Sequence, residues 1–124
     1  MTEKVEKVLY LSTHAAEDPE KAALPFVMAN GAMAMDIKAV IALQGPGVYM
    51  AWKGYIDKIQ KPGGFPEMKK LMSDFLELGG ELRVCVPCIR ERHIDESELI
   101  EGARTVAAGE LNVIALEADA VFTY

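Results

Sequence analysis

The segment LRVCVPCIRERH, residues 82–93, contains the transition that decides the fold, because an apolar run passes directly into a helix start. Residues 82–86 have the length of a buried strand, and Pro87 fits the first turn of a helix. Strand and helix alternate in the same way on both sides of this segment. That alternation is typical of α/β proteins with a mostly parallel sheet.

The chain on the amino-terminal side repeats the pattern. The apolar runs EKVLYLS (residues 6–12) and IKAVIAL (residues 37–43) predict two more strands. Between them, Asp18 followed by Pro19 predicts a helix start with a side-chain cap and a proline at the first helical position. The helix contains Pro25, which lacks the N–H for an interior bond and predicts a kink or a late start.

The remaining elements follow from turn residues and periodicity. QGPG at residues 44–47 predicts a turn and a short helix, and prolines and glycines at 60–66 predict a loop. The pattern also predicts an amphipathic helix over 67–78, a brief strand at 105–107, a helix over 110–118 and a strand over 120–124. The prediction is a single domain, residues 1–124, of the α/β class. It has three layers, α/β/α, around a mostly parallel five-stranded sheet of unassigned strand order.

The composition argues against several classes of function. The chain has 124 residues, 51% of them hydrophobic, and we expect part of this apolar surface to cover a subunit interface. A net charge of −6 argues against direct binding of nucleic acid. No apolar run approaches the roughly 20 residues of a membrane helix, and residues 1–7 carry no secretory signal. We therefore expect a cytoplasmic protein without membrane contact.

Cys85 and Cys88 form a C-x-P-C pair where the third strand is expected to end. In an open α/β sheet, ligands and chemistry collect at the carboxyl ends of the strands. A thiol near a helix start is expected to have a lowered pKa and to react as a thiolate. We predict that Cys85 and Cys88 are the catalytic residues and that they carry out sulfur or redox chemistry.

Charged residues surround this pair. Arg83, Arg90 and Arg92 are three of the chain's four arginines, and His93 follows them directly. A basic patch on an acidic protein can stabilise a thiolate or receive an anionic sulfur donor. His14 follows the first strand and is expected at the same edge, where it can help to deprotonate a cysteine. Each of these side chains can equally well be a solvated surface residue.

A ligand-binding role is predicted for the turn after the second strand. Gly45 and Gly47 can expose backbone N–H groups to an anion, and Tyr49 can wall the site. A tight turn alone explains the glycines as well. The chain has neither the lysine and hydroxyl of a P-loop nor a GxGxxG dinucleotide fingerprint, so we predict no cofactor.

Three other interpretations of the cysteines stay open. The C-x-P-C spacing resembles the thioredoxin motif and would permit a reversible disulfide. Free cysteines are also common as small buried core residues. Cys85, Cys88 and His93 fall one ligand short of a structural zinc site, so we predict no metal.

Several segments, in this order and spacing, carry a resemblance to a known family. They are EDPEKA at 17–22, GPGVY at 45–49, the cysteine segment followed by IDE at 94–96, GEL at 109–111 and the FTY ending at 122–124. Together they are similar to the DsrE/DsrF-like family of sulfur-relay proteins, over nearly the whole chain.

The resemblance implies a small DsrE-like α/β subunit that assembles into a homotrimer or homohexamer. It implies sulfur donor and acceptor proteins as partners, and a cysteine after the third long strand that accepts sulfur as a persulfide. Cys85 matches that position. Cys88 departs from the usual pattern, in which a small apolar residue follows, and it is either the working thiol, a resolving thiol or a helper.

Three functions are compatible with the sequence. The first is a sulfur relay, in which a cysteine persulfide moves between proteins and no stand-alone turnover is required. The second is a dithiol–disulfide redox protein of the C-x-P-C type. The third is a non-catalytic oligomeric binding module, for which replacing both cysteines would leave function intact.

Overall fold

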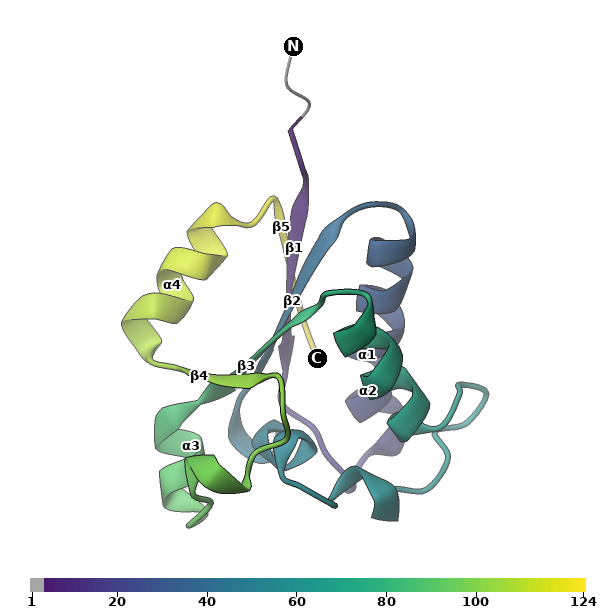
Figure 1. The fold of residues 1–124 in the computed structure, drawn as a ribbon, viewed down its shortest axis with the longest axis vertical. Coiled ribbons are helices and arrows are strands. Elements are labelled where there is room, and N and C mark those ends of the chain that lie inside the picture. The colour runs from purple at the N-terminus through teal and green to yellow at the C-terminus, as the bar shows by residue number, and fades with distance from the viewer. Residues whose placement is uncertain (1–3) are drawn as a thin grey trace.

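Five apolar runs pair into one parallel sheet of order β4-β3-β2-β1-β5, as seen in the computed structural model, which describes residues 4–124 (Figure 1). The strands are β1 (Lys7–Ser12), β2 (Lys38–Leu43), β3 (Glu81–Cys85), β4 (Ala103–Val106) and β5 (Ala120–Thr123). Every neighbouring pair is parallel. The predicted five-stranded sheet is confirmed, and the strand order is new. The prediction of no secretory signal concerns residues 1–7, of which residues 1–3 lie outside the described residues.

The connections between strands are helical. The α-helices are α1 (Pro19–Ala34), α2 (Met68–Glu77), α3 (Val86–Glu91) and α4 (Ala108–Glu117). Three short 3₁₀ helices join them, η1 (Gly45–Ala51), η2 (Ile56–Lys58) and η3 (Glu96–Glu98). The sequence analysis did not predict η2 or η3. Within the described residues, no helix is long and apolar enough to cross a membrane.

The strand order explains the layers. From β1 to β4 the chain steps in one direction across the sheet, so right-handed crossovers place α1 and α2 on the same face. The step from β4 back to β5, beside β1, reverses direction and places α4 on the opposite face. Figure 1 shows α4 on one side of the sheet and the α1–α2 pair on the other, which confirms the three-layer α/β/α class.

The two faces of the sheet are covered unequally. The main core lies under α1 and α2, where the rings of Phe26 and Phe75 meet edge to face with centroids 5.6 Å apart. The smaller core under α4 consists of Leu9, Val40 and Ala42 with partly buried neighbours. No residue of α4 is fully buried. The α4 face therefore contributes less hydrophobic stabilisation than the α1–α2 face.

A buried arginine anchors the start of α4. Arg83, whose side chain is 7% exposed, pairs with the Glu110 carboxylate at 2.8 Å and donates to the Thr105 carbonyl at 3.0 Å. A second carboxylate, Glu81, lies 3.5 Å from the guanidinium. Arg83 belongs to the cysteine segment in sequence, but its guanidinium is paired with carboxylates near the start of α4.

The predicted start of α1 at Pro19 is confirmed, and the helix continues through Pro25. The Asp18 carboxylate accepts a hydrogen bond from the Lys21 N–H at 3.1 Å, which is the predicted cap. Of the two outcomes predicted for Pro25, the late start is wrong, because α1 begins at Pro19 and continues through Pro25, and the kink stays a prediction. Pro25 is buried in the main core, and this packing offsets the missing N–H.

Strand pairing shifts some boundaries. β4 starts at Ala103, two residues before the predicted strand, because its ladder with β3 runs from the Leu82–Ala103 pair to the Cys85–Val106 pair. β3 ends at Cys85 for the same reason, and α4 begins at Ala108.

Asp119, just before β5, adds contacts to the backbone pairing of β5 with β1. The main-chain N–H of Lys7 donates to Asp119 at 2.9 Å, and the Asp119 N–H donates to the Lys7 carbonyl at 2.8 Å. The Lys4 ammonium also pairs with Asp119. The hydrogen bond from Lys4, followed by that from the Lys7 N–H, lowers the pKa of Asp119.

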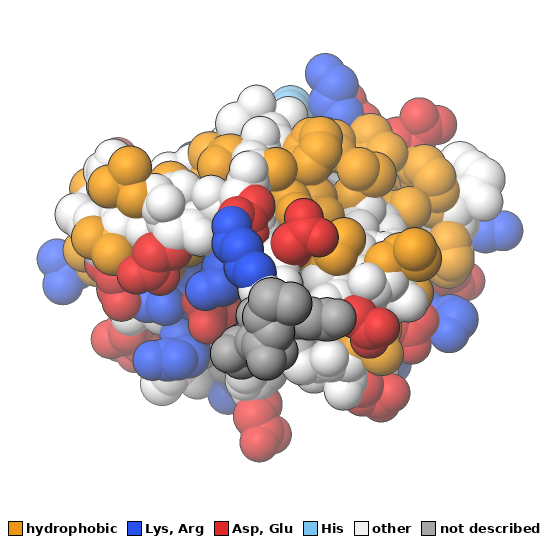
Figure 2. Space-filling model, turned by 90° about the horizontal axis from the view of Figure 1, so that it is seen from above, with side chains coloured by type: hydrophobic (Ala, Val, Ile, Leu, Met, Phe, Trp, Pro, Cys, Tyr) orange, Lys and Arg blue, Asp and Glu red, His pale blue; other side chains and the backbone are white. Residues whose placement is uncertain are grey.

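A cavity of about 500 Å³ lies at the amino edge of the sheet. Val5, Met33 and Leu78 are among its apolar lining residues, and Lys7 and Lys38 are among the charged ones. Figure 2 looks onto this end of the molecule and shows apolar side chains gathered there. Neither cysteine lines the cavity, because both lie at the carboxyl edge.

Two glycines offer a matched test of packing. A Cβ at Gly47 would lie 2.3 Å from the Ser12 carbonyl oxygen, whereas a Cβ at Gly31, within α1, meets nothing within 4 Å. We expect Gly47→Ala to lower the free energy of unfolding by about 1–3 kcal/mol through overpacking. Gly31→Ala should raise it by about 0.5–1 kcal/mol, because alanine favours helix. Chemical denaturation of both variants measures this, and equal stabilities would refute the close approach.

Candidate active site at the carboxyl edge

The cysteine pair spans the junction of β3 and α3. Cys85 is the last residue of β3 and the N-cap of α3, and Cys88 lies in the first turn of α3 after Pro87. Both thiols are free and half-buried, and both pack against the main core. The carboxyl edge therefore contains two partly accessible thiols three residues apart, as predicted.

A backbone N–H from the neighbouring strand points to Cys88. Gly45 follows β2 and begins η1, with a left-handed φ of 53°. Its N–H donates to the Cys88 sulfur at 3.3 Å. Because β2 and β3 are adjacent, the segment after one strand meets the helix after the other. The contact places a fixed hydrogen-bond donor against the Cys88 sulfur.

The environment of Cys85 raises the pKa of its thiol. Burial raises the pKa of the Cys85 thiol, and the hydrogen bond with the Cys88 side chain raises it further. The Cys88 main-chain N–H and the Arg92 charge lower it, but by less. The expected lowering at a helix start is thus not found for Cys85, because burial outweighs the contribution of a six-residue helix.

Arg92 joins α3 to an aromatic cluster. Its guanidinium donates to the Cys88 carbonyl at 3.1 Å and lies over the Tyr49 ring, 5.6 Å from the centroid. Tyr49 stacks on Tyr55 at 5.4 Å and contacts Trp52 at 6.0 Å. The predicted supporting residue Arg92 and the predicted wall residue Tyr49 are thus in contact with each other.

The aromatic cluster is held by polar contacts on both sides. The Trp52 indole donates to Glu98 at 3.1 Å, next to the bridge between Trp52 and Leu99. The Tyr55 hydroxyl accepts from the Ala16 N–H at 3.0 Å. The cluster therefore connects η3 to the loop that follows β1.

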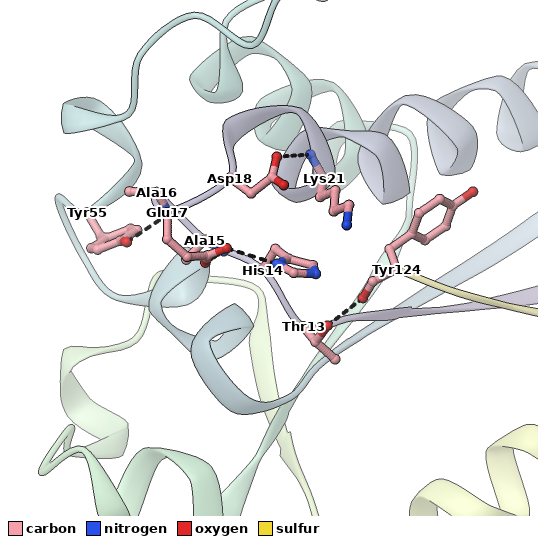
Figure 3. Close-up of polar contacts among 9 residues, drawn as sticks. All are labelled: Thr13, His14, Ala15, Ala16, Glu17, Asp18, Lys21, Tyr55 and Tyr124. Carbon is pink, nitrogen blue, oxygen red and sulfur yellow. Dashed lines mark hydrogen bonds and ion pairs between the residues drawn. The ribbon is translucent and has the colours of Figure 1, made fainter.

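His14 lies in that loop, at the carboxyl end of β1. Figure 3 shows its imidazole beside the Glu17 carboxylate, with Nδ1 and the carboxylate oxygen 2.9 Å apart. The same carboxylate accepts from the Ala15 N–H. Thr13 is tied to the Tyr124 carbonyl at 2.6 Å. His14 thus shares the edge with the cysteines, and its direct partner is Glu17.

Two predicted supporting residues have exposed positions. Arg90 points to solvent from α3, and His93 is exposed just after α3. His93 adopts a left-handed φ of 57°, and Ile94 donates back to the Ile89 carbonyl at 2.9 Å. That is the hydrogen-bonded ending in which glycine is usual. His93 thus terminates α3, and functional roles for Arg90 and His93 stay predictions.

The two glycines of the turn have different environments. The Gly47 N–H donates to the Gln44 carbonyl at 2.9 Å, so the turn itself uses it. Gly45 directs its N–H to Cys88. Sequence analysis missed this contact because the pair is 43 residues apart. A signal for the Cys88–Arg92 contact was present, since residues four apart are neighbours on a helix.

The residues do not gather a metal site. Across residues 4–124, no three histidine, cysteine, aspartate or glutamate side chains come together in a way that could hold a metal ion.

Similar sequences come from methanogenic archaea. The chain is 32% identical to protein MJ0989 of Methanocaldococcus jannaschii over 118 residues, 95% of this chain and 99% of that protein. It is 32% identical to protein MJ0760 of the same organism over 105 residues, 85% of this chain and only 38% of that protein. The chain therefore spans well under half the length of MJ0760. Protein MK0008 of Methanopyrus kandleri is 25% identical over 122 residues.

Two solved structures have the same fold. The YchN protein of E. coli matches with a TM-score of 0.73 and 18% identity, covering 97% of this chain and 100% of that one. Protein MTH1491 of Methanobacterium thermoautotrophicum matches with a TM-score of 0.72 and 15% identity, covering 98% and 100%.

A match to a family model identifies the family, which the shared fold alone does not. The model of the DsrE/DsrF-like family matches residues 6–124, which include every strand and helix of the sheet and both cysteines. The chain belongs to the DsrE/DsrF-like family.

Proposed function

We propose that the protein is a sulfur-relay protein that carries sulfur as a persulfide on the Cys85–Cys88 pair. Its family relates it to sulfur relay. In this proposal a donor protein supplies the sulfur and an acceptor protein removes it. The chain acts as a carrier without a cofactor or independent turnover, in a reducing cytoplasm where its thiols stay free.

One observation carries the proposal, the hydrogen bond from the Gly45 N–H to the Cys88 sulfur. This donor is fixed by η1 and faces a half-buried thiol that a second thiol accompanies. A preorganised N–H stabilises negative charge on sulfur without reorganisation during reaction. The Gly45 N–H can stabilise Cys88 as a thiolate nucleophile. After transfer, it can donate to the same Cys88 sulfur, which then carries the transferred sulfur atom.

The chemistry is nucleophilic transfer of one sulfur atom. A cysteine thiolate attacks the outer sulfur of the donor persulfide, a new S–S bond forms, and the donor leaves as a thiolate. In the second step the acceptor's thiolate attacks the outer sulfur on this protein, and the cysteine is regenerated as a thiolate. Each step breaks one S–S bond and forms one, so no net oxidation occurs.

Arg92 supports the anionic states of the site. It is the charged side chain whose proximity lowers the pKa of Cys85, and its position is fixed by the Cys88 carbonyl and the Tyr49 ring. It is also placed to attract an anionic sulfur group to the edge. Arg90, on the same helix, is exposed and provides a comparison.

Exposed apolar residues on α4 and β5 support assembly into a homotrimer or homohexamer. Val113 and Leu116 of α4 are 52% and 86% exposed, and Val121 and Phe122 of β5 are exposed as well. β5 is also an edge strand with unpaired backbone groups. We infer that a second copy of the chain covers this surface.

The redox alternative is supported by the contact between the thiols. Cys85 and Cys88 are both free thiols, three residues apart at the start of α3, so loss of two hydrogens would join them as a disulfide. A redox protein would form this disulfide with mild oxidants, and neither single-cysteine variant would keep a sulfur adduct from a persulfide donor.

The first prediction concerns sulfur uptake. The wild-type protein should consume glutathione persulfide and release glutathione, and the Cys85→Ser/Cys88→Ser double variant should lose this activity. The reaction is followed by chromatography of the glutathione species. Equal consumption by both proteins would refute the carrier proposal, and consumption by neither would favour the binding-module function.

The second prediction concerns Arg92. Arg92→Met removes a charge that favours the Cys85 thiolate, so the pKa of Cys85 should rise and its alkylation should shift to higher pH. We expect iodoacetamide to react roughly two- to five-fold more slowly near neutral pH, less than the tenfold of a full pKa unit.

Arg90→Met is the matched control, because it removes the same charge from an exposed position of α3. Both cysteines lie in one peptide, so fragment-ion mass spectrometry of that peptide gives the rate at each cysteine. An equal effect of both substitutions would show that net charge, and not the position of Arg92, controls the thiol.

The third prediction concerns assembly. Val113→Lys with Leu116→Lys places charge on the exposed apolar surface of α4 and should shift the protein towards monomer in size-exclusion chromatography with light scattering. Leu78→Lys, an exposed apolar residue at the amino edge, is the control and should leave the mass unchanged. An unchanged oligomer for the α4 variant would place the interface elsewhere.

A further inference from the structure

The two thiols differ in their surroundings although they are three residues apart. Cys88 accepts the N–H of Gly45 from a neighbouring strand segment. Among residues 4–124, no hydrogen bond from another element reaches Cys85, which is the N-cap residue of α3. The two sulfurs therefore have different surroundings, because a fixed N–H faces Cys88 whereas burial raises the pKa of Cys85.

Their spacing allows direct reaction between them. Residues three apart on a helix have Cβ atoms roughly 5–6 Å apart, whereas a disulfide requires about 3.5–4.5 Å, so bonding of the two sulfurs needs a small shift of the first turn of α3. Both side chains pack against the same main core, and the Cys88 side chain is among the groups that raise the pKa of Cys85. A persulfide formed on Cys88 would therefore lie next to a second thiol from the moment it forms.

We propose that Cys88 receives the sulfur and that Cys85 expels it as hydrosulfide when no acceptor protein removes it first. This inference rests on the proposed function and adds a second outcome for the bound sulfur. It also reverses the order that the resemblance implies, in which Cys85 is the first acceptor. The contacts at Gly45 and the pairing of the thiols are the reasons for the reversal.

The steps balance without an external oxidant. The Cys88 thiolate attacks the outer sulfur of a donor persulfide, giving Cys88–S–SH and the donor thiolate. Cys85 then attacks the Cys88 sulfur, and its proton goes to the departing terminal sulfur. The bond between Cys88 and the terminal sulfur breaks, a Cys85–Cys88 disulfide forms, and hydrogen sulfide leaves. The transferred sulfur is reduced by two electrons and the two cysteines are oxidised by two.

A thiol reductant returns the disulfide to the starting dithiol. Without one, each chain should release one sulfide and then stop. The stored sulfur would thus have a limited lifetime, set by how fast an acceptor competes with Cys85.

The test is a single turnover of the full chain with glutathione persulfide, without added reductant. Sulfide is trapped with a fluorescent alkylating reagent, and intact mass reports sulfur gain or hydrogen loss. We expect the wild type to release one sulfide and to lose two hydrogens. Cys85→Ser should keep one extra sulfur, with sulfide release at least about ten-fold lower, because the attacking thiol is absent.

Cys88→Ser should take up no sulfur, and Cys85→Ala checks that the serine hydroxyl does not cause the effect at position 85. Thermal unfolding of each variant confirms the fold. The inference is overturned if the wild type keeps an extra sulfur and releases no sulfide. It is also overturned if Cys85→Ser releases as much sulfide as the wild type. Uptake by Cys88→Ser but not by Cys85→Ser overturns the order. Donor consumption by none of the proteins refutes the carrier function itself.

Discussion

The close approach of Gly47 to the Ser12 carbonyl is the constraint on which the carboxyl edge depends. It allows η1 to pack directly over the end of β1, where any side chain at position 47 would collide with main chain. With η1 in that place, Gly45 meets the Cys88 sulfur and Tyr49 lies beneath Arg92. A packing requirement on one strand thus sets the chemistry of a thiol two strands away.

The unequal faces of the sheet have different roles. The α1–α2 face contains most of the buried apolar side chains and fixes the positions of the loops at the carboxyl edge. The α4 face has a thin core and depends on the ion pair between Arg83 and Glu110. A buried arginine needs its partners because an uncompensated charge there is costly. The buried apolar side chains therefore lie mostly on the α1–α2 face, whereas Val113 and Leu116 are exposed on α4.

Local signals made much of the fold predictable. Apolar runs identify the strands, and Asp18 before Pro19 identifies the start of α1. Pro25 alone did not decide between a kink and a late start, and its burial in the main core accompanies a helix that continues through it. The strand order and the ion pair of Arg83 with Glu110 depend on which segments become neighbours in space. Hydrophobic periodicity along the chain does not contain that information.

The site was predictable in the same partial way. The position of Cys85 and Cys88 at the end of β3 follows from the alternation of strand and helix. The raised pKa of Cys85 does not, because it results from burial among residues distant in sequence. The Gly45–Cys88 contact likewise requires knowing that β2 and β3 are adjacent.

The placement of β5 beside β1 has a consequence for synthesis on the ribosome. One edge of β1 finds its partner only when residues 120–123 have been made, and the Lys7–Asp119 contact spans 112 positions. Until then the growing chain exposes the backbone of its first strand, and such unpaired edges favour association with other chains. Contacts of such long sequence separation also slow folding. The nascent protein therefore completes this sheet only after residues 120–123 have been made, when β5 pairs with β1.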